Sequence, residues 1–203
     1  MAEQVKLLDE LVREWITPLL KSKGFKKAGL AYERDEADTI VVIGYQRSRD
    51  GGECDRFTVN LGIGSKRIFA FDDKRTNKRT PIELCHWRMR LGRTLEHSAD
   101  TWWELCSRSD VSVVGRAHQE VLTTKALPLL ERMAADEALR SEWKVGRAPG
   151  LTELQRLLNL SVLLNDSEHR PEQRTVVKEL KDLASRKGFG GRVAVHLEDL
   201  GIE

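Results

Sequence analysis

The stretch F-T-V-N-L-G-I, from Phe57 to Ile63, decides the fold class of this chain. Apolar side chains occupy every second position of the stretch, and threonine, asparagine and glycine lie between them. Successive side chains of a β-strand point to opposite faces of the sheet, so the alternation predicts one buried face and one polar face. A sheet with one polar face is typical of antiparallel proteins.

Other strand-like runs flank this stretch. The turn signal R-D-G-G at Arg49–Gly52 joins it to an Ile- and Val-rich run, so the two are expected to form a hairpin. Trp102–Leu105 is either a last short edge strand or the start of a helix. We therefore expect an antiparallel sheet of four or five strands. The predicted strands are Leu30–Arg34, Thr39–Arg47, Arg56–Gly64, His86–Leu91 and, as the fifth, Trp102–Leu105.

Helical periodicity marks both sides of the sheet region. Residues 3–23 have apolar side chains at helical spacing, with either a kink or the start of a new turn expected at Pro18 and a left-handed cap at Gly24. A long helix is expected from Val111 to Leu130, bent at Pro128. The fold class is therefore α+β. Further helices are expected at Asp136–Lys144, Leu151–Leu164, Gln173–Lys187 and Arg192–Leu200.

The composition indicates a folded protein that is not embedded in a membrane. The chain has 203 residues, of which 40% are hydrophobic and 33% are charged. It has no apolar run long enough to span a bilayer and no signal-peptide pattern at its start. One α+β domain at 1–147 and a helical C-terminal extension at 148–203 packed on it are expected, with Gly146–Gly150 as the linker.

The three cysteines are odd in number and widely spaced, without a C-x-x-C motif. This pattern predicts free thiols in a reducing cytoplasm. Cys85, His86, His97 and Cys106 are the residue types of a zinc site, but neighbours on a strand point to opposite faces. We therefore predict neither a metal nor a cofactor.

Several short motifs, in order, resemble a known family. They are G-F-K-K at Gly24–Lys27, Y-Q-R-S at Tyr45–Ser48, the run from Phe57 to Gly62, R-M-R-L-G at Arg88–Gly92, and the pair Trp102–Trp103. Over roughly residues 5–135 the chain resembles the bacterial domain-of-unknown-function family number 4304. The resemblance implies the fold and a bacterial origin, and it transfers no catalytic residue.

The polar face of the predicted sheet is the leading candidate site. Arginine forks on a strand face suit carboxylate or phosphate groups. The alternative is an exposed face, or one covered by the tail helices with internal salt bridges. If the two adjacent tryptophans lie on a strand, one points outward and one into the core; the alternative is that both are packed, one of them under a helix. The predicted partner-binding residues are Gln46, Asn60, Arg88, Arg90, Trp102 and Trp103.

Two alternatives use other residues. Segment Gly64–Arg93 holds nine Lys or Arg residues against three acids, which suits nucleic acid as well as a solvated loop. Asp72-Asp73-Lys74, with Asp55 or Asp38 as a second acid, offers a weak match to a metal-dependent nuclease. The predicted nucleic-acid-binding residues are Lys66, Arg67, Lys74, Arg75, Lys78 and Arg79.

No convergent catalytic set is visible beside the polar face. There is no G-x-S-x-G motif, and no cysteine has a signature neighbourhood. The leading hypothesis is a non-enzymatic bacterial protein-binding domain of the cytoplasm, such as an immunity protein or a defence-system accessory protein. Nucleic-acid binding is the first alternative, and a metal-dependent nuclease is the second. No membrane partner is expected.

Overall fold

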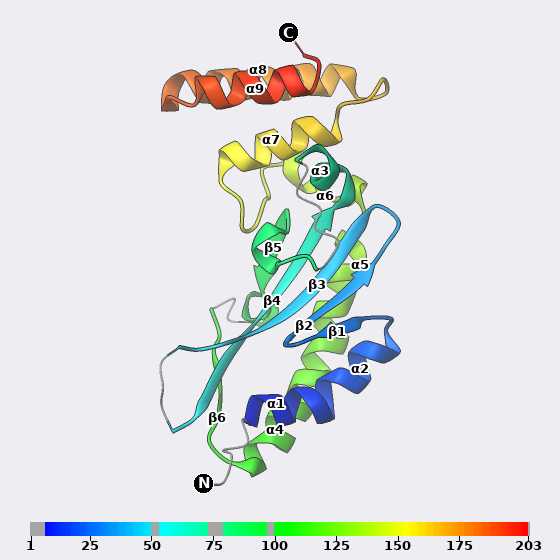
Figure 1. Cartoon of the computed structure of the whole chain (residues 1–203), viewed down its shortest axis with the longest axis vertical. Helices are drawn as coiled ribbons and strands as arrows, with labels where there is room; N and C mark the ends of the chain where they lie inside the picture. The colour runs from blue at the N-terminus through cyan, green and yellow to red at the C-terminus, as the bar shows by residue number, and fades with distance from the viewer. Residues whose placement is uncertain (1–6, 50–52, 73–78, 97–99, 203) are drawn as a thin grey trace.

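The chain forms an antiparallel sheet with helices against one of its faces (Figure 1). The computed structural model describes residues 7–49, 53–72, 79–96 and 100–202. A helical segment precedes the strands, the short helix α3 (Lys66–Phe71) lies between the fourth and fifth strands, and the longer helices follow the last strand. The α+β prediction is therefore confirmed. Within the described residues, no helix is long and apolar enough to cross a membrane.

Six strands make up the sheet in the described part of the chain, all paired antiparallel. The spatial order is β1-β2-β3-β4-β5, and β6 pairs with the other end of β4. The β3–β4 hairpin is confirmed, although the central residues of its turn lie outside the described residues. The expected four or five strands become six because the three-residue strand β1 is too short to show a pattern. The strands are β1 (Lys26–Ala28), β2 (Ala31–Asp35), β3 (Thr39–Arg47), β4 (Asp55–Ser65), β5 (Trp87–Arg90) and β6 (Trp103–Leu105).

Proline bends both helical segments that cover the sheet. Each segment contains a π-helical turn that ends two residues before its proline, Pro18 or Pro128. Proline clashes with the carbonyl four residues before it, and the wider π-turn relieves that clash. The first segment is α1 (Leu7–Leu11), η1 (Val12–Ile16) and α2 (Thr17–Ser22), and the second is α4 (Arg108–Val121), η4 (Leu122–Ala126) and α5 (Leu127–Met133).

The N-terminal helical segment ends at the predicted left-handed cap. Gly24 has a φ of +81°, which a side chain would strain. The amide of Phe25 donates to the carbonyl of Leu20 at 3.0 Å, as in a Schellman motif. Phe25 is thereby folded back into the core, where it is buried.

The hydrophobic core lies between the sheet and these two helical segments. The side chains of Phe57, Val59, Leu61 and Ile63 have no exposed surface. They pack in one cluster with buried residues of the helices. In Figure 1, α4 and α5 run behind the strands. The alternation in β4 thus identified the face that the helices cover.

The C-terminal helices extend the molecule beyond one end of the sheet (Figure 1). Helix α7 contacts α3 and α6, and α8 packs on α7 with α9 beside it. The buried Arg156 of α7 ties these helices together, because it donates to Glu153 and to the carbonyl of Trp143 in α6. The boundary at 147 stays a prediction. The helices are α3 (Lys66–Phe71), α6 (Asp136–Lys144), α7 (Glu153–Leu163), α8 (Arg170–Lys187) and α9 (Gly190–Asp199).

The prediction of three free thiols is wrong. Cys54, just before β4, forms a disulfide with Cys106, which follows β6. The two positions are 52 residues apart, so their pairing depends on the register between β4 and β6. Cys85 is free and buried. Burial raises its pKa to about 12, so this thiol stays protonated and unreactive.

Candidate functional site

The strand register brings the predicted polar side chains onto one face of the sheet. Gln46 of β3 lies opposite Thr58, and Asn60 of β4 lies opposite Arg90 of β5. These positions alternate with the core residues, so they face away from the helices. The amide of Asn60 donates to the Gln46 side-chain oxygen at 3.1 Å. We call this surface the open face.

Two adjoining cavities form a groove across the open face. Their volumes are about 410 and 390 Å³, and both are lined by Gln46, Asn60, Ile82 and Glu83. The segment before β5, which includes the 3₁₀ turn η2 (Ile82–Leu84), lines both cavities.

The two halves of the groove differ in chemistry. One half is mainly apolar, with Leu30, Ala31 and Val42 in its lining. The other half contains Arg90 and Arg93. Arg93 is exposed and has no ion pair within the described residues. A groove of this kind can accept an apolar side chain and a carboxylate at the same time.

Arg90 and Trp102 form an aromatic and cationic pair beside the groove. The Arg90 guanidinium lies 5.2 Å from the centre of the Trp102 ring, a cation–π contact. Its Nη1 also pairs with Asp100 at 2.8 Å. Trp102 is therefore the tryptophan that points outward, as predicted for one of the pair.

Trp103 was predicted as a binding residue, and the structure leaves it half-buried and packed against the core. It pairs with Phe57 in the β4–β6 register, and their rings stack with centres 5.8 Å apart. The ring of His118 from α4 lies 4.5 Å from that of Trp103. Adjacent strand residues point to opposite faces, so Trp103 points inward where Trp102 points outward.

Arg88 was also predicted as a binding residue, but its donors are used inside the molecule. Its guanidinium donates to the carbonyls of Glu83 at 2.6 Å and Gly150 at 2.5 Å. Its backbone amide donates to Pro149 at 3.1 Å. Gly150 has a φ of +79°, and a Cβ there would lie 2.8 Å from that of Arg88. Arg88 therefore anchors the linker before α7, a role hidden from the local sequence.

His118 was missed by the sequence analysis. Its ring is surrounded by Tyr45, Phe57 and Trp103 in the core. Burial lowers its pKa to about 4, because the charged ring would lose its hydration there. The imidazole is therefore neutral at pH 7. A histidine at a helical core position carries no sequence signal that separates it from a surface histidine.

The predicted nucleic-acid residues are partly committed to internal contacts. Lys66 pairs with Asp35 at 2.9 Å and donates to the carbonyl of Ala37 at 3.3 Å. Arg67 donates to the carbonyl of Asn165 at 2.8 Å and pairs with Asp166 at 3.6 Å. Arg79 is exposed beside the groove. Lys74, Arg75 and Lys78 lie outside the described residues.

Among the described residues, the structure does not bring together the side chains proposed for a nuclease site or for a zinc site. Asp55 begins the long strand β4, whereas Asp72 lies beyond the other end of that strand, after α3; Asp55 pairs with Arg47 at 3.2 Å. Asp73, Lys74 and His97 are outside the described part. Within that part, no group of three His, Cys, Asp or Glu residues could hold a metal.

Comparison with known proteins assigns the sheet and its covering helices to a family. Residues 16–132 match the family model described as a domain of unknown function (DUF4304). The match covers more than half of the chain, so the chain belongs to this family. The resemblance predicted from the motifs is confirmed. No curated protein and no solved structure matches the chain.

Proposed function

We propose that this protein is a non-enzymatic binding domain that holds a segment of a protein partner in the groove on the open face. The observation that supports it is the groove itself, with apolar Leu30 and Val42 in one half and Arg90 beside Trp102 in the other. Arginine and tryptophan are the residue types that most often dominate protein interfaces.

The groove chemistry favours a partner segment with an apolar side chain near a carboxylate. Arg90 and Arg93 supply donors for the carboxylate, and the apolar half buries the side chain. The exposed amide of Gln46 and the half-buried amide of Asn60 can bond to an extended backbone. Arg88 and Trp103 support this surface from within the fold and are no longer proposed as contacts.

We further propose a bacterial and cytoplasmic setting, with an immunity or defence-system role as the class of pathway. Disulfides are rare in reducing cytosol, so in this setting Cys54 and Cys106, which the fold brings within bonding distance, would be held mainly as thiols. Alkylating the thiols in intact cells before lysis tests this setting. A fully oxidised pair in growing cells would favour an oxidising compartment instead.

The deciding experiment is affinity capture from host lysate, with and without nuclease treatment. The test variant is the double substitution Arg90→Ala and Arg93→Ala. The control is Arg116→Ala, because Arg116 is exposed on α4, which packs against the opposite face. One stoichiometric protein should be retained by the wild type and the control after nuclease treatment, and the double variant should lose it.

Two outcomes would overturn the proposal. Equal capture by the double variant would remove the groove as the binding surface. Loss of all partners on nuclease treatment would put nucleic-acid binding first, and Arg79→Ala would then be the next variant. Circular dichroism of each variant shows that the fold is retained.

A further inference from the structure

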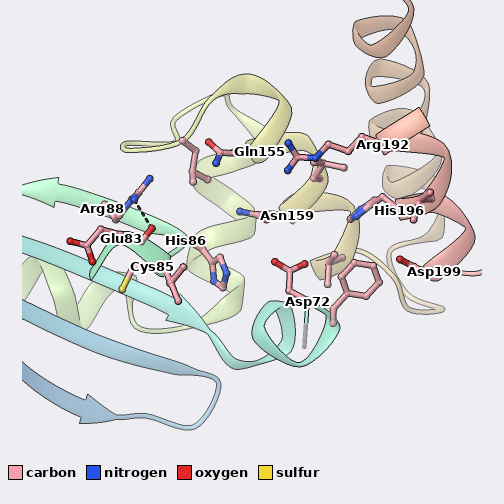
Figure 2. A pocket seen from close by; sticks show the side chains of 16 residues that line it. Asp72, Glu83, Cys85, His86, Arg88, Gln155, Asn159, Arg192, His196 and Asp199 are labelled. Carbon is pink, nitrogen blue, oxygen red and sulfur yellow. Dashed lines mark hydrogen bonds between the residues drawn. The ribbon is translucent and has the colours of Figure 1, made fainter. Parts of the chain in front are cut away.

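A second cavity lies where the C-terminal helices meet the sheet domain (Figure 2). Its volume is about 370 Å³, which is at the small end of ligand pockets. The end of α3, the segment before β5, α7 and α9 supply its lining. Glu83 and Arg88 line both this cavity and the groove, so they separate the two.

Groups of opposite charge enter this cavity from different elements. Asp72, after α3, and Arg192, on α9, extend toward it from opposite sides in Figure 2. Asn159 of α7 and His196 of α9 lie between them. Within the described residues, Arg192 has no ion pair and the Asn159 side chain has no hydrogen bond. The cavity therefore offers both signs of charge and a neutral amide.

Hydrogen bonds anchor His196 to α7. Its Nε2 lies 2.8 Å from the hydroxyl oxygen of Ser161, and that hydroxyl lies 2.7 Å from the carbonyl oxygen of Leu158. The imidazole ring of α9 is thereby held at the cavity.

The pKa of His196 shows which charges surround its ring. Burial lowers this pKa, nearby Asp72 and Asp199 oppose the shift, and nearby Arg192 adds to it. All three charged groups are thus close enough to act on the ring. The imidazole is neutral at pH 7, so it contributes no charge.

A singly charged ligand suits this arrangement poorly. An anion on Arg192 would lie near the carboxylates of Asp72 and Asp199, and a cation on Asp72 would lie near Arg192. Like charges held around one cavity repel each other, so a single charge gains from one side and loses on the other. A small molecule with both charges pairs with each side at once.

We propose that this cavity binds a free α-amino acid as its zwitterion. Arg192 takes the α-carboxylate, for which its planar fork is suited. Asp72 takes the α-ammonium, and the neutral ring of His196 lies beside it. The side chain lies against the apolar part of the lining, formed by Phe71, Leu84, Leu151, Leu158, Val162 and Val195.

This site combines the matched family segment with the helices beyond it. Asp72 lies within residues 16–132, and Asn159, Arg192 and His196 lie after them. A bound amino acid would join the two parts and would stabilise the folded chain by mass action. The proposal is independent of the groove and its partner.

The test is a binding screen with each of the twenty L-amino acids as the probe, by thermal shift and then calorimetry. For each amino acid that binds, the matching carboxylate without the amine and the matching amine without the carboxylate are also measured. At least one amino acid should bind and raise Tm. Each singly charged analogue should bind at least about tenfold more weakly, because one charge-assisted contact is lost.

Matched variants locate the site. Arg192→Gln and Asp72→Asn should each weaken binding of the amino acid by about tenfold or more. Arg174→Gln, on the exposed surface of α8, should leave the affinity unchanged. Because Asp72 and Arg192 are exposed, both variants should keep the wild-type Tm without ligand. Binding by no amino acid, or equal binding by either analogue, would overturn the proposal.

Discussion

The two faces of strand β4 have the same backbone and opposite roles. Phe57, Val59, Leu61 and Ile63 are fully buried under the helices, whereas Asn60 between them lines the groove. Burial consumes every side chain on the first face, so that face can only stabilise. The second face includes polar groups such as Asn60 that are left only half-buried. A binding role is therefore more plausible on the face that packing leaves open.

The open face is closed at one end, and glycine makes the closure possible. A Cβ on Gly62 would lie 2.5 Å from Ile82 Cδ1 and 2.7 Å from Cys85 Sγ. The segment before β5 can pack there only because Gly62 has no side chain. Further along the face, the larger side chains of Asn60 and Gln46 line the groove. The groove thus begins where the sheet changes from Gly62, which has no side chain, to the larger residues Asn60 and Gln46.

The sharpest test of the comparison uses two adjacent residues of β4. Leu61→Ala should lower the free energy of unfolding by about 2–5 kcal/mol, because it leaves a cavity in the core. Asn60→Ala, one position away on the open face, should cost less than about 1 kcal/mol. Urea denaturation of both variants measures the difference. Similar losses would mean that the open face is packed as tightly as the core.

Acid should act on the helix-covered face through His118. The unfolded histidine takes up a proton below its ordinary pKa of 6.5, and the folded one only near 4. Stability should therefore fall as the pH drops from 6.5 to 4, by about 3 kcal/mol from this group. Below pH 4 this group causes no further loss.

His118→Phe tests that contribution, because the ring volume is nearly kept and the titration is removed. The variant should show a flatter dependence of unfolding free energy on pH between 4 and 6.5 than the wild type. Denaturation at several pH values measures it. Parallel curves for the two proteins would show that His118 is accessible to protons in the folded state. Substitutions on the open face should leave the dependence of unfolding free energy on pH between 4 and 6.5 unchanged.

The sequence predicted the faces better than their contacts. Alternation in β4 and β5 assigned Leu61 inward and Arg90 outward, because a two-residue period is a local property. Proline and glycine signals placed the bend at Pro128 and the cap at Gly24 for the same reason. The Cys54–Cys106 disulfide depends on strand register across 52 residues, and no local pattern contains it.

The candidate site was predicted in part. The surface of Gln46, Asn60 and Arg90 follows from strand period and pairing. The anchoring role of Arg88 depends on Gly150, which is 62 residues away. The cavity with Asp72 and Arg192 combines residues even further apart. Contacts of this kind depend on how helices return to the sheet, which periodicity does not encode.

The smallest predicted effect separates two arginines of the same strand. Arg88 and Arg90 have the same direction, but Arg88 holds two carbonyls and Arg90 holds an exposed carboxylate. Arg88→Ala should cost about 1–2 kcal/mol of unfolding free energy, because Glu83 and Gly150 lose a charged donor. Arg90→Ala should cost less than about 1 kcal/mol, since the ion pair with Asp100 is partly exposed to solvent and such pairs contribute little. A larger loss of unfolding free energy for Arg90→Ala than for Arg88→Ala would contradict this comparison. It would mean that ion pairs on the open face stabilise the fold, and that the residues proposed for binding have a structural role instead.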